Sequence, residues 1–389
     1  MKLRTRLAQK GRTANARPGT VNLPVARAST VTFESLAHLE DTQKRFEAGE
    51  IIPTYGIVNM PLRSAFEELM VEIEGGHRAV TLPSGLAAVA VAILACVKAG
   101  DHVLVTDSAY GPTRRFCDDT LKRMGVETTY YDPLVGAGIT QHLRPNTRVV
   151  YLESPGSLTF EVQDFPAIAA AAHVAGAAVI HDNTWATGVY FRSFEHGADL
   201  VVQAATKYPA GHSDLLIGAV VANEAWWPRL RDTSRQLGQT TSPDDIYLAL
   251  RGMRTLAVRL KQHEAAALEV ARWIEQQPAV ARVLHPALAN DPGHALWKRD
   301  FLGSSGLFGV ELKPCSRAAQ AAFIDPLECF SLGYSWGGFE SLLVPANLRG
   351  ARSVRPWSGG PLVRLHIGLE DPADLMADLA QGFARLQAA

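Results

Sequence analysis

Two apolar runs that each end in polar residues constrain the fold of this chain more than any other stretch. The first run, Ala177–Ile180, precedes Asp182, and the second, Ala198–Ala205, precedes Lys207. Short apolar runs rich in β-branched residues are typical of strands buried on both faces of a parallel sheet. Ligands of open α/β sheets bind beyond the carboxyl ends of the strands. We therefore expect Asp182 and Lys207 to lie at the same edge of one sheet.

Each of these residues has a plainer interpretation when it is taken alone. A lysine after a strand is commonly a solvated strand end, and an aspartate there commonly caps a helix. Together they suit pyridoxal 5'-phosphate (PLP), because a carboxylate keeps a ring nitrogen protonated and an amine forms a Schiff base. The pair Asp182 and Lys207 therefore predicts a PLP site.

The order of strand and helix patterns predicts the architecture. Their alternation up to about residue 245 indicates a mostly parallel sheet of the seven-stranded type with helices on both faces. A capping sequence at Ser242 opens one long helical pattern to about Gln277, typical of a helix that links a large domain to a small one. We predict an N-terminal arm (1–57) without a periodic core pattern, a PLP-binding domain (58–245), and a smaller α/β C-terminal domain (246–389) that includes the linker helix. Further predicted strands are 102–106, 126–131, 149–153, 217–221, 280–284, 307–312, 330–334 and 362–367, and further predicted helices are 61–73, 87–97, 112–124, 165–174, 317–324 and 372–386.

Composition argues against several classes of function. The net charge of −1 over 389 residues gives no basic surface for nucleic acid or for a membrane. The four cysteines have no zinc-ligand spacing, so no metal site is predicted. The basic N-terminus is followed by no apolar signal-peptide core, and the most apolar run, 86–97, is too short to span a bilayer. We expect a cytoplasmic protein whose partner is a small-molecule substrate.

A phosphate seat is predicted at Ser84-Gly85-Leu86, where an apolar helix begins. Ser84 suits the N-cap position, and Gly85 lets the backbone approach a ligand closely. The free N–H groups and the dipole of a helix N-terminus favour an anion. A capped helix without a ligand is the alternative interpretation of the same residues.

Four motifs resemble the cysteine/methionine-metabolism family of PLP-dependent enzymes, and within it the bacterial cystathionine β-lyase group. They are residues 152–157 (LESPGS), 203–208 (QAATKY), 334–338 (YSWGG) and 364–371 (RLHIGLED). The γ-acting members usually carry Ser where this chain has Ala204 and Leu where it has Trp336. The resemblance extends from Tyr55 to the final helix. It implies the aspartate-aminotransferase-like fold (fold type I) and a homotetramer, built as a dimer of dimers, with shared active sites.

The resemblance also implies a role for individual residues. Lys207 would bind PLP covalently and then move protons on the substrate, and Asp182 would pair with the pyridine nitrogen. Tyr110 would stack on the cofactor ring, and Tyr55 would reach in from a neighbouring subunit; with Lys207 these are the catalytic candidates. The other implied cofactor contacts are Gly85, Leu86, Thr184 and Thr206, and the implied substrate contacts are Arg364 (for the α-carboxylate), Ser335 and Trp336.

The implied reaction is α,β-elimination of L-cystathionine to homocysteine, pyruvate and ammonia, a step of methionine biosynthesis. Three alternatives stay open: the same chemistry on another S-substituted cysteine, a γ-acting enzyme, and a non-catalytic PLP-binding protein. One departure bears on them, because Ile57 stands where the family usually has an arginine that clamps the cofactor phosphate of the adjacent subunit. Losing a charge-assisted hydrogen bond costs about 1.5–3 kcal/mol. Arg63, six residues further on, is a candidate substitute.

Overall fold

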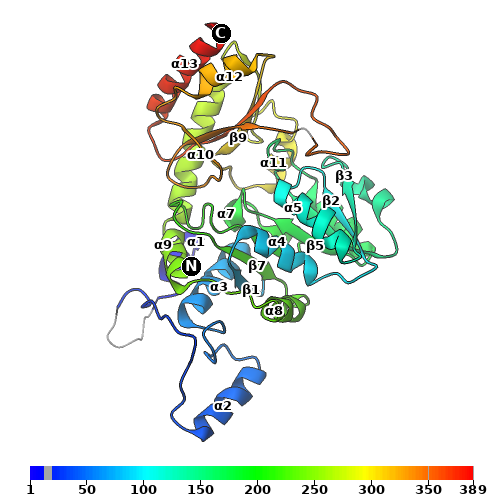
Figure 1. The fold of residues 1–389 in the computed structure, drawn as a ribbon, viewed down its shortest axis with the longest axis vertical. Coiled ribbons are helices and arrows are strands. Elements are labelled where there is room, and N and C mark those ends of the chain that lie inside the picture. Colours follow the sequence, from blue (N-terminus) through cyan, green and yellow to red (C-terminus); the bar gives the residue numbers. More distant parts are fainter. Residues whose placement is uncertain (13–19, 349, 389) are drawn as a thin grey trace.

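Two sheets organise the chain, each in its own domain (Figure 1). The computed structural model describes residues 1–12, 20–348 and 350–388. The large sheet has the strand order β1-β7-β6-β5-β4-β2-β3. Its strands are β1 Arg78–Leu82, β2 His102–Thr106, β3 Glu127–Tyr131, β4 Thr147–Glu153, β5 Ala178–Asp182, β6 Leu200–Gln203 and β7 Gly218–Ala222. Neighbours from β6 to β3 are parallel, whereas β7 is antiparallel to both β1 and β6. The predicted α/β fold with a mostly parallel seven-stranded sheet is confirmed.

Helices cover both faces of the large sheet, which explains why its strands are continuous apolar runs. Along β4, Val150 and Leu152 join one hydrophobic core, while Val149 and Tyr151 join the other. Successive side chains of a strand point to opposite faces, so both faces must be apolar when both are covered. The first core includes α3 Pro61–Glu74, α6 Phe165–Val174 and α9 Pro243–Met253, and the second includes α4 Gly85–Leu94 and α8 Trp227–Gln236.

The smaller domain has a five-stranded sheet of order β10-β11-β12-β9-β8. The helix α10 Leu256–Ile274 runs from the large domain into this one (Figure 1). Its buried residues from Ala266 to Ile274 share a third core with the sheet and with the helices on it, whereas Leu256, Ala257 and Leu260 belong to the first core. The elements are β8 Val280–Leu284, β9 Leu307–Leu312, β10 Ser331–Leu332, β11 Leu342–Ala346, β12 Leu362–His366, α12 Arg317–Ile324 and α13 Pro372–Ala388. A smaller α/β domain after the large one is thus confirmed, while the predicted residue boundaries of the domains stay a prediction.

The expectation of one helix from about Ser242 to Gln277 is wrong, because the stretch forms two helices, α9 and α10. The break lies at residues 254–255. The carbonyl of Gly252 accepts hydrogen bonds from the N–H of Thr255 (3.1 Å) and from Arg259 (2.8 Å). A side chain thus occupies a carbonyl that a continuing helix would use. The break gives α10 a direction of its own toward the small domain.

The segment without a periodic core pattern contains two helices that the sequence did not predict. They are α1 Leu3–Gln9, which packs on the large domain through buried Leu7, and α2 Leu36–Glu47, which stands away from the body (Figure 1). The predicted helix 112–124 is instead α5 Gly111–Arg115 followed by the π-helical turn η1 Phe116–Leu121. Other unpredicted elements are α7 Thr187–Tyr190, α8, α11 His294–Asp300, β11, η2 Gly136–His142 and η3 Ser193–His196.

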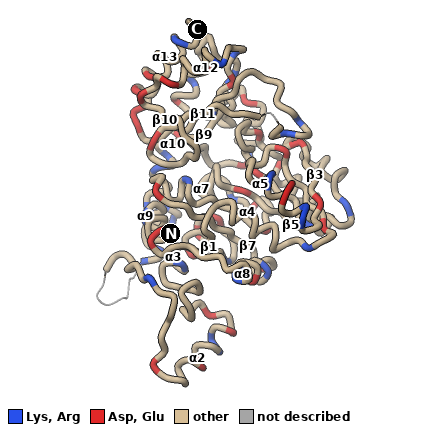
Figure 2. Tube along the Cα trace, viewed as in Figure 1, with Lys and Arg blue, Asp and Glu red and all other residues tan. Residues whose placement is uncertain are grey.

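Charged residues of both signs are interspersed along both domains (Figure 2), in keeping with the net charge of −1. Within the described ranges, no helix is both long and apolar enough to cross a bilayer.

Candidate active site

Three ionisable side chains meet where parallel strands of the large sheet end. Asp182 is the last residue of β5, and Lys207 follows the end of the neighbouring β6. Glu153 is the last residue of β4 and pairs in register with Asp182. Electrostatic interaction couples Asp182 to both Lys207 and Glu153. The structure therefore brings the two residues that the sequence singled out to one edge and adds a second carboxyl group.

Asp182 is buried and held by hydrogen bonds. The backbone N–H and hydroxyl of Thr184 donate to its Oδ1 at 3.1 and 2.5 Å, and the Tyr151 hydroxyl donates to Oδ2 at 3.3 Å. Burial raises the pKa of Asp182, while these hydrogen bonds and the charge of Lys207 oppose the rise. A buried carboxylate of this kind gains from a cationic partner. The Thr184 hydroxyl also accepts from Ala204 N–H (3.0 Å). Thr184 therefore links Asp182 to the segment that leads to Lys207.

The Lys207 amine lies among groups from the small domain. It donates to Ser335 Oγ at 2.5 Å and lies 5.3 Å from the centre of the Trp336 ring. Burial, and then the positive charge of Arg364, lower the pKa of Lys207 to about 8, against the effect of Asp182. With that pKa, about a tenth of the amine is neutral at pH 7. A neutral amine can attack an aldehyde and accept a proton.

The loop that carries Ser335 packs directly on the lysine. Ser335 and Gly337 have positive φ angles of 76° and 88°. A Cβ on Gly337 would lie 2.9 Å from Tyr208 N and 3.0 Å from the Lys207 backbone, so the approach requires glycine. Arg364, on β12, donates to the Ser335 carbonyl at 2.8 Å. Burial lowers the pKa of Arg364 to about 10, which leaves it charged at neutral pH and suited to bind a carboxylate.

The predicted phosphate seat is a helix N-terminus in close contact with the chain before Lys207. Ser84 caps α4 by accepting from Ala87 N–H at 3.1 Å, and α4 begins at Gly85. A Cβ on Gly85 would lie 2.5 Å from Ala204 Cβ. The backbone of the helix start therefore packs closely on Ala204, which only glycine permits, and the Leu86 side chain that follows is 39% exposed.

The other expected phosphate contact, Thr206, is already engaged within the chain. Its hydroxyl donates to the carbonyl of Ile217 at 3.1 Å and accepts from the N–H of Ile217 at 2.9 Å. These bonds tie the residue before Lys207 to the start of β7. A donation from the Thr206 hydroxyl to a phosphate would need the hydroxyl to turn, and this role stays a prediction.

Tyr110 follows β2 and its side chain is half exposed; its backbone N–H donates to Glu153 Oε2 at 2.7 Å. Burial, and then the charges of Glu153 and Asp182, raise the pKa of Tyr110. Burial and the charge of Asp182 raise the pKa of Glu153 well above its ordinary range. No role for Glu153 was predicted from the sequence, although Glu153 ends an apolar run just as Asp182 does, and that pattern could have identified it.

The N-terminal segment presents Tyr55 on a tight turn. Val58 N–H donates to the Tyr55 carbonyl at 2.8 Å, and the Tyr55 side chain is half exposed. The Arg63 guanidinium donates to the carbonyls of Ile57 (2.9 Å) and Thr81 (2.7 Å), and it pairs with a carboxylate one helical turn on. Arg63 therefore braces the Ile57 turn within its own chain, which argues against its replacing the family's phosphate-binding arginine.

The donor set fits PLP. The described groups are an amine with a lowered pKa (Lys207), a buried carboxylate that a cation would stabilise (Asp182), and a glycine-flanked helix start that can bind a phosphate (Gly85). The sheet edge supplies all three, and the small domain adds Arg364 for a carboxylate. The fold and the site thus define a PLP-dependent enzyme whose active site lies between a large and a small domain.

The chain belongs to the Cys/Met metabolism PLP-dependent enzyme family, whose profile matches residues 4–384. It is 49% identical over 390 residues to a putative cystathionine β-lyase of Rhizobium johnstonii, covering 99% of this chain and 97% of the relative. It is 46% identical over 392 residues to cystathionine β-lyase MetC of Escherichia coli, covering 99% of both. The crystal structure of a cystathionine γ-synthase from Xanthomonas oryzae pv. oryzae, in complex with aminoacrylate and cysteine, is 30% identical. That structure superimposes with a TM-score of 0.91 over 100% of this chain and 99% of the other.

Proposed function

We propose that the chain is a PLP-dependent carbon–sulfur lyase that converts L-cystathionine and one water into homocysteine, pyruvate and ammonia by α,β-elimination and hydrolysis of the eliminated product. The observation that carries the proposal is the Lys207 amine, which burial brings to a pKa of about 8 and which lies beside both Trp336 and the partly buried Arg364. The cystathionine β-lyases among its relatives, 46–49% identical over nearly the whole chain, support this substrate.

Each residue has a task that follows from its position. When bound, PLP supplies an electron sink for the negative charge that develops at the substrate Cα. Arg364 binds the α-carboxylate and so fixes which bond at Cα faces the lysine. Lys207 takes the proton from Cα and delivers a proton to the departing sulfur, which its near-neutral pKa permits. Asp182 keeps the ring nitrogen protonated.

Two residues favour β- over γ-elimination. Ala204, where γ-acting members usually carry Ser, has its methyl group directly against the helix start at Gly85. Trp336, where they usually carry Leu, packs on Tyr208 with ring centres 5.5 Å apart and extends over the Lys207 amine. The wide ring fills space beside the lysine that a smaller side chain would leave to the substrate.

The test is product identification with L-cystathionine and excess PLP. We expect the wild-type protein to release pyruvate, Lys207→Ala to release none, and the control Lys122→Ala, at an exposed site, to match the wild type. Pyruvate release by Lys207→Ala at the wild-type rate would contradict the proposal. Release of α-ketobutyrate would support the γ-acting alternative. A protein that stays colourless with PLP and releases neither product would support the non-catalytic alternative.

A second candidate substrate class is favoured by Ile57. An isoleucine in place of a cation puts an apolar side chain where the adjacent subunit meets the site, which suits a cysteine whose sulfur carries an apolar group. Comparing kcat/KM for cystathionine with that for S-alkyl cysteines separates the two candidates. A higher value for cystathionine supports the first, and a higher value for an S-alkyl cysteine supports the second.

We infer that the enzyme is a homotetramer, a dimer of dimers in which Tyr55 reaches a neighbour's site. Support comes from the half-exposed Tyr55 and from α2, whose Leu36 and Leu39 are 69% and 43% exposed. Mass measurement in solution tests the assembly. Mixing the inactive variants Tyr55→Ala and Lys207→Ala tests the shared site, because a mixed dimer has one intact site; mixtures without activity would contradict sharing.

We also propose that the enzyme works in the cytoplasm. All four cysteines lie in the described part of the chain and are free thiols. Disulfides are the common state of paired cysteines in oxidising compartments, whereas free thiols are the rule in the reducing cytoplasm. Fractionation of cells that produce the protein tests the proposal, and recovery outside the cytoplasmic fraction would contradict it.

A further inference from the structure

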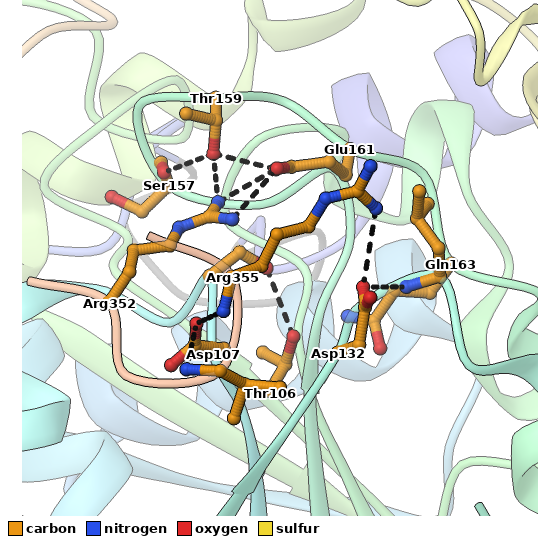
Figure 3. A network of polar contacts seen from close by, with 12 residues as sticks. Thr106, Asp107, Asp132, Ser157, Thr159, Glu161, Gln163, Arg352 and Arg355 are labelled. Carbon is orange, nitrogen blue, oxygen red and sulfur yellow. Dashed lines mark hydrogen bonds and ion pairs between the residues drawn. The ribbon is translucent and has the colours of Figure 1, made fainter. Parts of the chain in front are cut away.

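A polar network joins the connection between β11 and β12 to the loop that carries Tyr110 (Figure 3). Its first anchor is Asp107, which directly follows β2. The Asp107 carboxylate accepts hydrogen bonds from the N–H groups of Ser353 (2.9 Å), Val354 (3.0 Å) and Arg355 (2.9 Å). The Asp107 side chain is buried, so its carboxylate depends on these bonds and on its ion pair with Arg114 of the large domain. Three successive N–H groups on one carboxylate fix the path of the small-domain connection over the large domain.

The second anchor lies one residue earlier on the same connection. The Arg352 guanidinium donates to the two carboxylate oxygens of Glu161 at 2.8 and 2.9 Å, and it also contacts Thr159 (Figure 3). Arg352 is buried, and this fork is the strong, directional form of an ion pair. Glu161 belongs to the loop after β4, whereas Asp107 follows β2. The connection thus spans two neighbouring strand ends of the large sheet.

The turn at residues 107–110, which carries Tyr110 and is called the Tyr110 turn, lies between these anchors. Asp107 begins the turn, the carbonyl of Ser108 accepts from Ser157 N–H at 2.8 Å, and the N–H of Tyr110 donates to Glu153 at 2.7 Å. A Cβ on Gly156 would lie 2.5 Å from Ser108 Cβ, so the loop after β4 touches the turn without a gap. A shift of the Asp107 anchor therefore moves the backbone on which the Tyr110 ring is mounted.

We propose that Asp107 is a positioning residue for the reaction: by seating the connection 352–355 on the large domain, it holds the Tyr110 ring in place. The inference rests on the proposed function, in which Tyr110 stacks on the cofactor. Asp107 acts through Tyr110 and touches neither cofactor nor substrate. A misplacement of about 1 Å in a group that orients reactants costs up to about 100-fold in rate. Loss of the anchor should therefore lower kcat more than it alters KM.

The test is a double-mutant cycle of Asp107→Asn and Tyr110→Ala in the PLP-loaded enzyme. We expect Asp107→Asn alone to lower kcat for cystathionine by about 10- to 100-fold, to change KM less than about threefold, and to weaken the circular dichroism of the cofactor band. In the Tyr110→Ala background the same change should lower kcat no further, because the ring that Asp107 positions is gone. Equal losses in both backgrounds, or an unchanged dichroism band, would overturn the proposal.

Two further variants keep the test decisive. Arg352→Lys keeps the charge but loses the fork to Glu161, so it loosens the same connection at the other anchor; we expect kcat to fall several-fold with the same dichroism change. Asp132→Asn is the matched control, since Asp132 pairs with Arg355 of this connection at 3.6 Å in an exposed position. Its kcat and spectrum should equal the wild type. If Asp107→Asn does not fold, the test rests on Arg352→Lys. A wild-type kcat and a wild-type dichroism band in Arg352→Lys would then overturn the proposal.

Failure of this inference is distinguishable from failure of the proposed function. A wild-type enzyme that binds PLP and releases pyruvate, while Asp107→Asn behaves like Asp132→Asn, refutes only the positioning role. A wild-type protein that binds no PLP, or that releases no pyruvate, refutes the proposed function itself and with it the positioning role.

Discussion

In the proposed role of Lys207 as the PLP-binding residue, its lowered pKa should determine how fast the apoenzyme captures PLP. Only the neutral amine attacks an aldehyde, so the capture rate follows the neutral fraction. Burial, followed by the charge of Arg364, brings the pKa of Lys207 from its ordinary 10.5 to about 8. At pH 7 this fall increases the neutral fraction by a factor of about 300. We expect the capture rate to rise with pH, with its midpoint near pH 8, and to reach a plateau about one to two pH units above that.

Two substitutions should move that midpoint in opposite directions. Arg364→Met removes a positive charge that favours the neutral amine, so the pKa of Lys207 should rise; Asp182→Asn removes a negative charge, so it should fall. One charge acting on a partly desolvated site is worth on the order of 1 kcal/mol, which is about fivefold to tenfold in rate at pH 7. Because burial is the largest cause, both variants should stay well below 10.5.

The assay is rapid mixing of apoenzyme with PLP from pH 6 to 10 at constant ionic strength, followed by absorbance of the bound cofactor. Arg123→Met, which removes an exposed arginine, is the charge-matched control and should leave the midpoint unchanged. This absorbance measurement needs no substrate, so the proposed role of Arg364 in substrate binding does not interfere. A wild-type midpoint near 10, or a shift of both variants in the same direction, would refute the reasoning.

Three other substitutions test separate parts of the structure. Ile57→Arg should tighten PLP about 10- to 100-fold in equilibrium dialysis by restoring about 1.5–3 kcal/mol of phosphate contact, whereas Val58→Arg should not; equal affinities contradict this. Gly85→Ala brings a Cβ to 2.5 Å from Ala204 Cβ and should weaken PLP about tenfold in a fluorescence titration, which wild-type affinity would disprove. Burial raises the pKa of Glu74 to about 7 from 4.5, so its contribution to the free energy of unfolding is fully present below pH 4.5 and is lost as the pH rises through 7. Urea unfolding should show that the free energy of unfolding falls by about 3 kcal/mol between pH 4.5 and 7. Glu74→Gln should remove this pH dependence, and an unchanged pH dependence in the variant would exclude Glu74 as its cause.

The strand ends of the large sheet were predictable because their signals are local. β4, β5 and β6 are apolar runs of strand length; β4 and β5 end in Glu153 and Asp182, and Lys207 lies four residues beyond the end of β6. The direction of β7 was not predictable from its own sequence. The chain between β6 and β7 contains Lys207 and no helix, so it returns beside β6 in the antiparallel direction. Parallel neighbours need a longer crossover connection.

The contacts that complete the site are long-range, and no sequence pattern shows them. Lys207 and Ser335 are 128 residues apart, and Arg352 and Glu161 are 191 apart. The resemblance to the family supplied Ser335, whereas nothing in the sequence marked Arg352. The break between α9 and α10 was missed for a related reason, because the side chain of Arg259, seven residues downstream, donates to the Gly252 carbonyl.

The structure also limits what the replacement of the family's arginine by Ile57 can change. The turn keeps its shape through the backbone: Gly56 N–H donates to the Ser29 carbonyl at 2.8 Å, and a Cβ on Gly56 would lie 2.0 Å from the Ala28 carbonyl oxygen. The side chain at position 57 therefore changes the charge that the turn presents and leaves its path intact. The proton-transfer groups around Lys207 belong to other elements, so the exchange should alter cofactor affinity and substrate entry and spare the elimination chemistry. We therefore expect the residue at position 57 to alter cofactor affinity without altering the proton transfer that Lys207 is proposed to carry out.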